Sequence, residues 1–148
     1  MTGSGPARQL DAGRLWAGGL ATAGVAALIA VAGILLARGL LKIPVLGPQG
    51  DGLWGNANTM TYALAAGFTA LAATGLLHIL ALTTPRPARF FTWIMGLLTT
   101  IAAVLPLTLE AATASRVATA TINLILGLAI ISILNGVART AFRKTPNQ

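Results

Sequence analysis

The chain contains no cysteine, only three acidic residues and a single histidine among its 148 residues. Without cysteine there are no disulfide bonds, no thiol redox chemistry and no thiolate metal sites. One histidine cannot supply two axial ligands to a haem, and with no cysteine or intramembrane acid beside it a lone histidine makes a poor metal site. We therefore expect no cofactor and no bound metal.

The three acids, Asp11, Asp51 and Glu110, all lie outside the long apolar runs of the sequence. Coupled transporters commonly place a carboxylate within a membrane helix to carry a proton or a cation. Small multidrug exporters are similar to this chain only in size, because their membrane-embedded glutamate has no counterpart here. A buried acidic relay is therefore excluded.

Hydrophobic residues make up 55% of the chain and charged residues only 9%. This balance is far outside the range of soluble domains, so lipid is the expected solvent. The net charge is +7 and the pI is about 11.8, but the basic residues stand between apolar runs instead of gathering on one face of a soluble domain. We expect the lipid bilayer as a partner and no nucleic acid.

A short basic hinge at residues 83–89, Thr-Thr-Pro-Arg-Pro-Ala-Arg, separates two of the apolar runs. Two prolines bracket Arg86, so neither flanking helix can continue through the hinge. Arg86 and Arg89 are costly inside hydrocarbon and belong at one membrane surface. The chain is therefore predicted to fold back at this point.

The apolar runs predict an all-α membrane protein, an up-down bundle of four transmembrane helices. A span of about 20 residues crosses a hydrocarbon core of about 30 Å. We expect a single domain at residues 15–138, with a flexible cytoplasmic tail at 1–14 and a basic cytoplasmic tail at 139–148. The spans are predicted at residues 15–37, 60–82, 90–109 and 117–137.

Small residues and helix signals refine these spans. Asn58 or Thr59 is expected to cap the second helix, Pro106 to loosen the end of the third, and Gly136 with Arg139 to end the fourth. Small residues at four-residue spacing allow a neighbouring backbone to approach closely. Such files are Gly19/Ala23/Ala27, Gly33/Ala37, Ala63/Gly67 and Ala66/Ala70.

The first apolar run has an alternative interpretation as a cleaved signal peptide. Arg8 and Arg14 precede an apolar core, and Ala30-Val31-Ala32 is similar to the small-x-small pattern before a cleavage point. The apolar run continues past that point to full spanning length, so we favour a retained first span. The sequence leaves cleavage open.

The longest polar interval is residues 38–58. Its first part contains Leu40, Leu41, Ile43, Val45 and Leu46, enough apolar residues to lie at the membrane interface. Trp54 is then a candidate anchor at headgroup level. We favour a solvated loop resting on the bilayer over a ligand-binding segment.

Basic residues set the expected orientation in the cell membrane. With the amino terminus inside, seven basic residues fall inside and three outside. The positive-inside tendency therefore predicts that both termini are cytoplasmic. The inner residues are Arg8, Arg14, Arg86, Arg89, Arg139, Arg143 and Lys144, and the outer ones are Arg38, Lys42 and Arg116.

Three polar residues within the spans are candidates for packing or binding: His78, Asn123 and Asn135. His78 and Asn135 lie at equal depth in their spans, and we predict that they form a hydrogen bond between helices, in preference to a ligand or proton site. Asn123 lies deeper, within a turn of the level of Thr69, and is the better candidate for a buried contact between helices. A pair of Ser132 with His78 lacks both a Gly-x-Ser-x-Gly context and an orienting acid, so we expect no catalytic residues and no enzyme.

Several segments together carry a family resemblance. They are Gly-Leu-Leu-His-Ile-Leu-Ala-Leu at 75–82, the basic hinge, Phe-Phe-Thr-Trp-Ile at 90–94, Leu-Pro-Leu at 105–107 and Ala-Thr-Ala-Thr-Ile-Asn-Leu-Ile-Leu-Gly at 118–127. From about Leu15 to Arg139 the chain resembles a family of small four-span membrane proteins of unknown function found in actinobacteria. The resemblance implies no assigned activity and no catalytic residues. It also implies that members of the family often have a polar residue in the last span at the position of Asn123.

Two functions fit these features. The first is an interaction or accessory protein, whose small-residue helix faces dock on a membrane-protein partner or on further copies of the chain. The alternative is a small carrier or channel in which Asn123, His78 and neighbouring threonines line an uncharged polar path.

Overall fold

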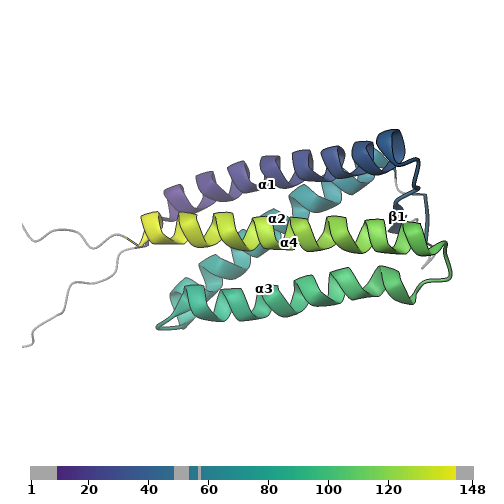
Figure 1. Cartoon of the computed structure of the whole chain (residues 1–148). Coiled ribbons are helices and arrows are strands. Elements are labelled where there is room, and N and C mark those ends of the chain that lie inside the picture. Colours follow the sequence, from purple (N-terminus) through teal and green to yellow (C-terminus); the bar gives the residue numbers. More distant parts are fainter. Residues whose placement is uncertain (1–9, 49–53, 57, 143–148) are drawn as a thin grey trace, which may run out of the picture.

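The computed structural model describes residues 10–48, 54–56 and 58–142. Its main elements are four helices, each long and apolar enough to cross a membrane. Three of them lie along similar axes, and the second is tilted across them (Figure 1). The prediction of an all-α, four-span fold is confirmed. The helices are α1 (Ala12–Leu35), α2 (Thr59–Thr83), α3 (Pro87–Val104) and α4 (Thr113–Ala141).

The helices form a ring in which α1 packs against α2 and α4, and α3 packs against α4 and α2. Successive helices run in opposite directions, so the start of α1 and the end of α4 lie at the same end of the bundle as the α2–α3 connection (Figure 1). We call this the hinge end and the opposite one the loop end. At the hinge end the Asp11 N–H donates to the Ala141 carbonyl, at 3.2 Å, and joins α1 to α4.

Two helix starts have side-chain caps. Asp11 Oδ1 accepts from the Arg14 N–H at 3.1 Å, and Asn58 Oδ1 accepts from the Met60 N–H at 3.0 Å. Because Asp11 satisfies one of the free N–H groups of the first turn, α1 begins at Ala12. The expectation of a flexible tail through residue 14 is therefore wrong for its last three residues, whereas residues 1–9 lie outside the described part.

The end of α4 also differs from the prediction. The helix continues past Gly136 and Arg139 to Ala141, so the expected tail at 139–148 is wrong for its first residues. Ala138 and Ala141 are buried against the other helices, and this packing outweighs the helix-ending tendency of one glycine. Residues 143–148 lie outside the described part.

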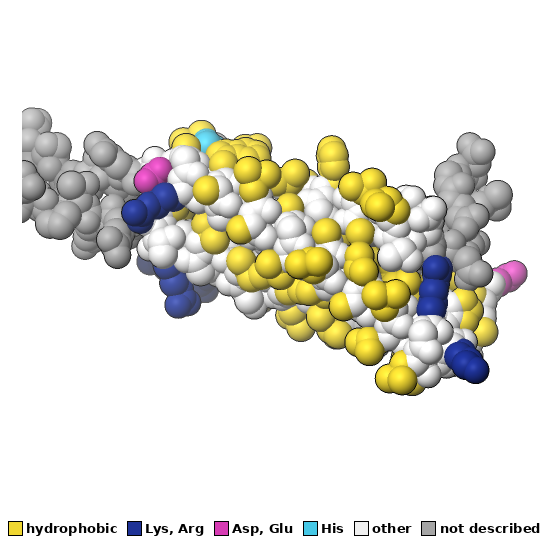
Figure 2. Space-filling view, turned by 90° about the horizontal axis from the view of Figure 1, so that it is seen from above, with side chains coloured by type: hydrophobic (Ala, Val, Ile, Leu, Met, Phe, Trp, Pro, Cys, Tyr) yellow, Lys and Arg dark blue, Asp and Glu magenta, His cyan; other side chains and the backbone are white. Residues whose placement is uncertain are grey.

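Small residues fill much of the interior, and many large apolar side chains face outward. On α1 the buried positions are Leu15, Gly19, Thr22, Ala26, Ala30 and Ile34. Phe68, in contrast, is 77% exposed. Hydrophobic side chains cover the length of the molecule between charged groups at its two ends (Figure 2). This arrangement suits a bundle whose outer surface meets hydrocarbon chains.

Glycines mark the closest approaches between helices. A Cβ added at Gly19 would clash with the Thr74 side chain on α2, and one added at Gly67 would lie 3.5 Å from the Ala23 carbonyl oxygen on α1. A Cβ at Gly127 would likewise clash with Thr99. The α1–α2 and α3–α4 seams are therefore both close backbone contacts of the type that small residues permit.

Part of the segment after α1 packs into the loop end of the bundle. A π-helical turn, η1 (Leu36–Leu40), extends α1, and Lys42 then adopts a φ of 55° as the chain reverses. Val45 is fully buried, and the Leu46 N–H donates to Thr119 Oγ1 at 2.9 Å. The expected contact with the membrane interface therefore does not hold for Val45 and Leu46, because the bundle itself covers their side chains.

A small antiparallel ladder completes this segment. Strand β1 (Leu46–Pro48) pairs with β2 (Trp54–Asn56), with Leu46 opposite Asn56. Leu40 and Leu41 stay exposed, so they are the part of the interval that still faces outward. The side chain of Trp54, the expected headgroup anchor, lies outside what the structure describes.

Candidate functional site

Asn123 joins three helices near the loop end. Its Oδ1 accepts a hydrogen bond from the Tyr62 hydroxyl on α2, and its Nδ2 donates to the Ala102 carbonyl on α3 at 2.7 Å. Asn123 itself belongs to α4. One amide side chain thus connects every helix of the bundle except α1.

The Ala102 carbonyl needs a side-chain donor because of the proline four residues later. In a regular helix the N–H at that position would donate to it, and Pro106 has none. Here α3 ends at Val104 and continues as a 3₁₀ turn, η2 (Leu105–Thr108). Asn123 supplies the missing donor, which is one way membrane helices accommodate proline.

Sequence reasoning singled out Asn123 but not its partners. Thr69, the neighbour considered from depth, donates instead to the carbonyl of Ala65 at 2.8 Å. Two features of the sequence could have predicted these partners. One is the chain's only tyrosine, at 62 in the first turn of α2, and the other is the Ala102 carbonyl, which Pro106 leaves without a donor.

His78 lies on the α1–α2 side of the bundle. Its Nδ1 accepts a hydrogen bond from Trp16 Nε1 at 3.1 Å, and the two rings are tilted with centroids 6.2 Å apart. Because an indole N–H can only donate, His78 Nδ1 is the acceptor in this contact. Trp16 is 41% exposed, so the pair lies at the outer surface of the bundle.

Asn135 lies on the α3–α4 seam instead. Its Nδ2 donates to Thr92 Oγ1 at 2.9 Å, and its Oδ1 is buried without a partner in the described part of the chain. The predicted hydrogen bond between His78 and Asn135 is therefore wrong. Equal depth along two helices does not make residues meet when one faces α1 and the other faces α3.

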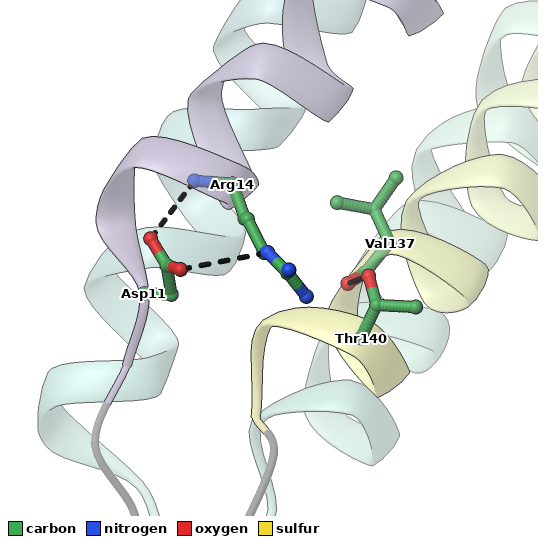
Figure 3. A network of polar contacts seen from close by, with 4 residues as sticks. All are labelled: Asp11, Arg14, Val137 and Thr140. Atoms are coloured by element: carbon green, nitrogen blue, oxygen red, sulfur yellow. Dashed lines mark hydrogen bonds and ion pairs between the residues drawn. The ribbon is translucent and has the colours of Figure 1, made fainter.

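Charged side chains lie at the two ends of the bundle (Figure 2). At the hinge end Arg14 Nε lies 3.6 Å from Asp11 Oδ2, and the guanidinium group extends toward the last turn of α4 beside Val137 and Thr140 (Figure 3). A cation is favourable there because the negative end of the helix dipole is at the carboxyl end. At the loop end Arg116 Nη1 donates to the Leu107 carbonyl at 3.0 Å.

Of the four threonines buried in the described part of the chain, three are satisfied locally. Their hydroxyls donate to carbonyls one turn earlier in the same helix, so they need no partner. Within the described residues no three His, Cys, Asp or Glu side chains lie close enough to hold a metal ion. The threonine-to-carbonyl pairs are Thr22 to Gly18, Thr74 to Ala70 and Thr119 to Ser115.

Fold and polar contacts together define a small membrane-embedded protein whose helices are joined by a few hydrogen bonds. The sequence profile of DUF6069, a family of unknown function, matches residues 10–140, and the chain belongs to this family. Comparison with curated proteins gave no match, and neither did comparison with solved structures.

Proposed function

We propose that this protein is a non-enzymatic interaction or accessory protein of the cell membrane, with both termini in the cytoplasm. It docks through its outer helix faces on another membrane protein or on a second copy of itself. The observation that carries the proposal is a difference between the interior of the bundle and its outer faces. Most polar side chains inside the described bundle bond to its own helices, whereas Gly24 and Gly136 on its outer faces lie open.

Gly24 on α1 and Gly136 on α4 are the open positions that matter most. A Cβ added at either would meet no other atom within 4 Å. Such positions allow the backbone of another helix to approach closely, and close approach is what drives helix association in lipid. Gly24 and Gly136 therefore mark the faces on which we expect a partner.

The carrier alternative would require a polar path through the bundle, and the interior favours docking instead. Tyr62, the partner of Asn123, and His78 are about 24 Å apart along α2, from 16 residues at about 1.5 Å each. The buried positions between them include Ala66, Ala70 and Ala73. Thr74 is the one polar residue among the buried positions of this stretch, and its hydroxyl donates to the Ala70 carbonyl of the same helix. A stretch of this kind supports helix packing more than passage of a polar solute.

The test is mild detergent extraction from the native membrane, followed by native electrophoresis and mass spectrometry. We expect a larger protein, or a second copy, in fixed stoichiometry with the chain. Gly24→Leu and Gly136→Leu place bulk on two different outer faces without touching the chain's own atoms, so each serves as the control for the other. Recovery of a monomer alone, or a complex that neither substitution weakens, would overturn the proposal and make transport assays in vesicles the next step.

The family resemblance adds two narrower proposals. We propose that other members also have four spans and that the source is an actinobacterium. The order of apolar runs, basic hinge and late proline supports both.

A further inference from the structure

Two arginines flank the α3–α4 seam at the hinge end. The hydrogen bond from Asn135 to Thr92 sets the two helices in register at this point. Arg89 lies three residues before Thr92 on α3, and Arg139 lies four residues after Asn135 on α4. Since the helices are antiparallel, both steps lead toward the hinge end, by about 4.5 Å and about 6 Å, and keep to the same helix faces.

The positive charge of this pair is not balanced by the chain. Arg89 and Arg139 are exposed, and neither makes a hydrogen bond or ion pair with any residue in the described ranges. Of the chain's three acids, Asp11 is engaged by Arg14, Glu110 belongs to the loop end, and Asp51 belongs to the segment joining β1 to β2. The described part of the chain therefore leaves the pair available to an anion from outside.

The surroundings of Arg89 are those of a lipid headgroup and the start of its acyl chain. Phe90 and Trp93 follow it on α3 and are 50% and 67% exposed, as aromatic side chains at the membrane interface commonly are. Gly96, one turn beyond Thr92, would carry an added Cβ with no atom within 4 Å. The face leading away from the arginines thus has room for an acyl chain.

We propose that Arg89 and Arg139 bind the phosphate of one anionic phospholipid in the leaflet at the hinge end. Arginine presents a planar set of donors that matches phosphate oxygens, and basic sites between transmembrane helices bind anionic headgroups. The acyl chain lies along Trp93 and Gly96. This lipid site adjoins the docking face marked by Gly136, which lies three residues before Arg139 on α4, but the lipid proposal does not depend on that docking.

The test is competition between two lipids, followed by native mass spectrometry of the full chain. The purified protein is mixed with equal amounts of phosphatidylglycerol and phosphatidylcholine that have the same acyl chains. An arginine near an anionic lipid contributes about fivefold, so two predict about a 25-fold preference for phosphatidylglycerol. Arg89→Gln with Arg139→Gln removes the preference, and the corresponding pair of lysine substitutions keeps part of it.

Arg14→Gln is the matched control, since Arg14 is at the same end but already has Asp11 as its partner. The proposal is overturned if the wild-type chain retains both lipids equally, or if Arg14→Gln removes the preference as fully as the double substitution does. It is also overturned if inorganic phosphate alone displaces the retained lipid, because the site would then bind free phosphate.

A second measurement needs no substitution at the site, in case the double variant does not fold. In a chain carrying Trp16→Phe and Trp54→Phe, Trp93 is the remaining tryptophan. Brominated phosphatidylglycerol is expected to quench its fluorescence several-fold more than brominated phosphatidylcholine at equal concentration. Equal quenching by the two lipids would overturn the proposal.

Discussion

Asn123 supplies the hydrogen bond that Pro106 cannot donate to the Ala102 carbonyl, and it also accepts one from Tyr62. Its removal therefore breaks two hydrogen bonds at once. In Asn123→Leu both the Ala102 carbonyl and the Tyr62 hydroxyl lose their partner. We expect a loss of about 1–2 kcal/mol in the free energy of unfolding, since each contact between membrane helices contributes on the order of 0.6 kcal/mol and an unpaired buried group costs more. Reversible unfolding in mixed micelles with increasing dodecyl sulfate measures this value.

A second substitution identifies the cause. Pro106→Ala returns an N–H four residues after Ala102, so the carbonyl regains a donor within its own helix. The cost of Asn123→Leu should therefore be smaller in the Pro106→Ala background than in the wild type. Equal costs in the two backgrounds would show that Asn123 does not compensate for the proline. Tyr62→Phe measures how much of the change in the free energy of unfolding comes from the Tyr62 hydroxyl.

The two remaining polar positions give a prediction about coupling. His78→Ala and Trp16→Phe should interact by about 0.6 kcal/mol in a double-mutant cycle, because their side chains share a hydrogen bond. His78→Ala and Asn135→Ala should add within about 0.5 kcal/mol, because these residues have different partners. Coupling between His78 and Asn135, without coupling between His78 and Trp16, would instead support the hydrogen bond expected from depth alone.

The sequence identified these polar positions but not their contacts, and the reason is geometric. Depth in the membrane follows from counting residues along a span, so His78 and Asn135 could be placed at one level. Which residues meet also depends on which helices are neighbours and how each is rotated. His78 faces Trp16 on α1, and Asn135 faces Thr92 on α3, contacts that span 62 and 43 residues of sequence.

At the scale of the helix, Gly127 allows α4 to approach α3. An added methyl group would clash with the Thr99 side chain, which is itself buried. Gly127→Ala should therefore lower the free energy of unfolding by about 1–3 kcal/mol, the usual cost of overpacking. The same unfolding titration in mixed micelles measures it.

Gly96 is the matched control for this substitution, because it also lies within a helix but has open space around it. Gly96→Ala should be neutral or stabilise the chain by up to about 1 kcal/mol through helix propensity. Thr99→Ala should relieve much of the clash with an alanine at 127. If Gly127→Ala and Gly96→Ala changed stability alike, the α3–α4 seam would not be a close contact.

The loop-end segment shows where sequence patterns fail at the element scale. Alternating apolar residues in a connection indicate that one side is covered, but they do not say whether lipid or protein covers it. Val45 is covered by the bundle, and the Leu46 N–H bonds to Thr119, a residue 73 positions away. Only the arrangement of α1 beside α4 brings these groups together.

For the whole molecule, hydropathy was sufficient to predict the number and type of the helices, because each must cross the same hydrocarbon thickness. Short connections at Thr84–Arg86 and between η2 and α4 make their neighbours antiparallel, which gives the up-down order. The contact between α1 and α4, which closes the ring, carries no comparable signal. It depends on local matches such as Gly18 against Val137.

Orientation is the remaining property of the whole molecule, and the absence of cysteine makes it directly testable. Single cysteines are introduced at Ala88, in the first turn of α3 at the hinge end, and at Ala112, at the loop end, both of which are exposed. Because seven of the ten basic residues belong to the hinge side by sequence, we expect that side to be cytoplasmic. A membrane-impermeant maleimide should then label Ala112→Cys in intact cells and label Ala88→Cys only after permeabilisation. The reverse pattern would invert the topology and place Arg89 and Arg139 in the outer leaflet. The proposed site would then need an anionic phospholipid in that leaflet.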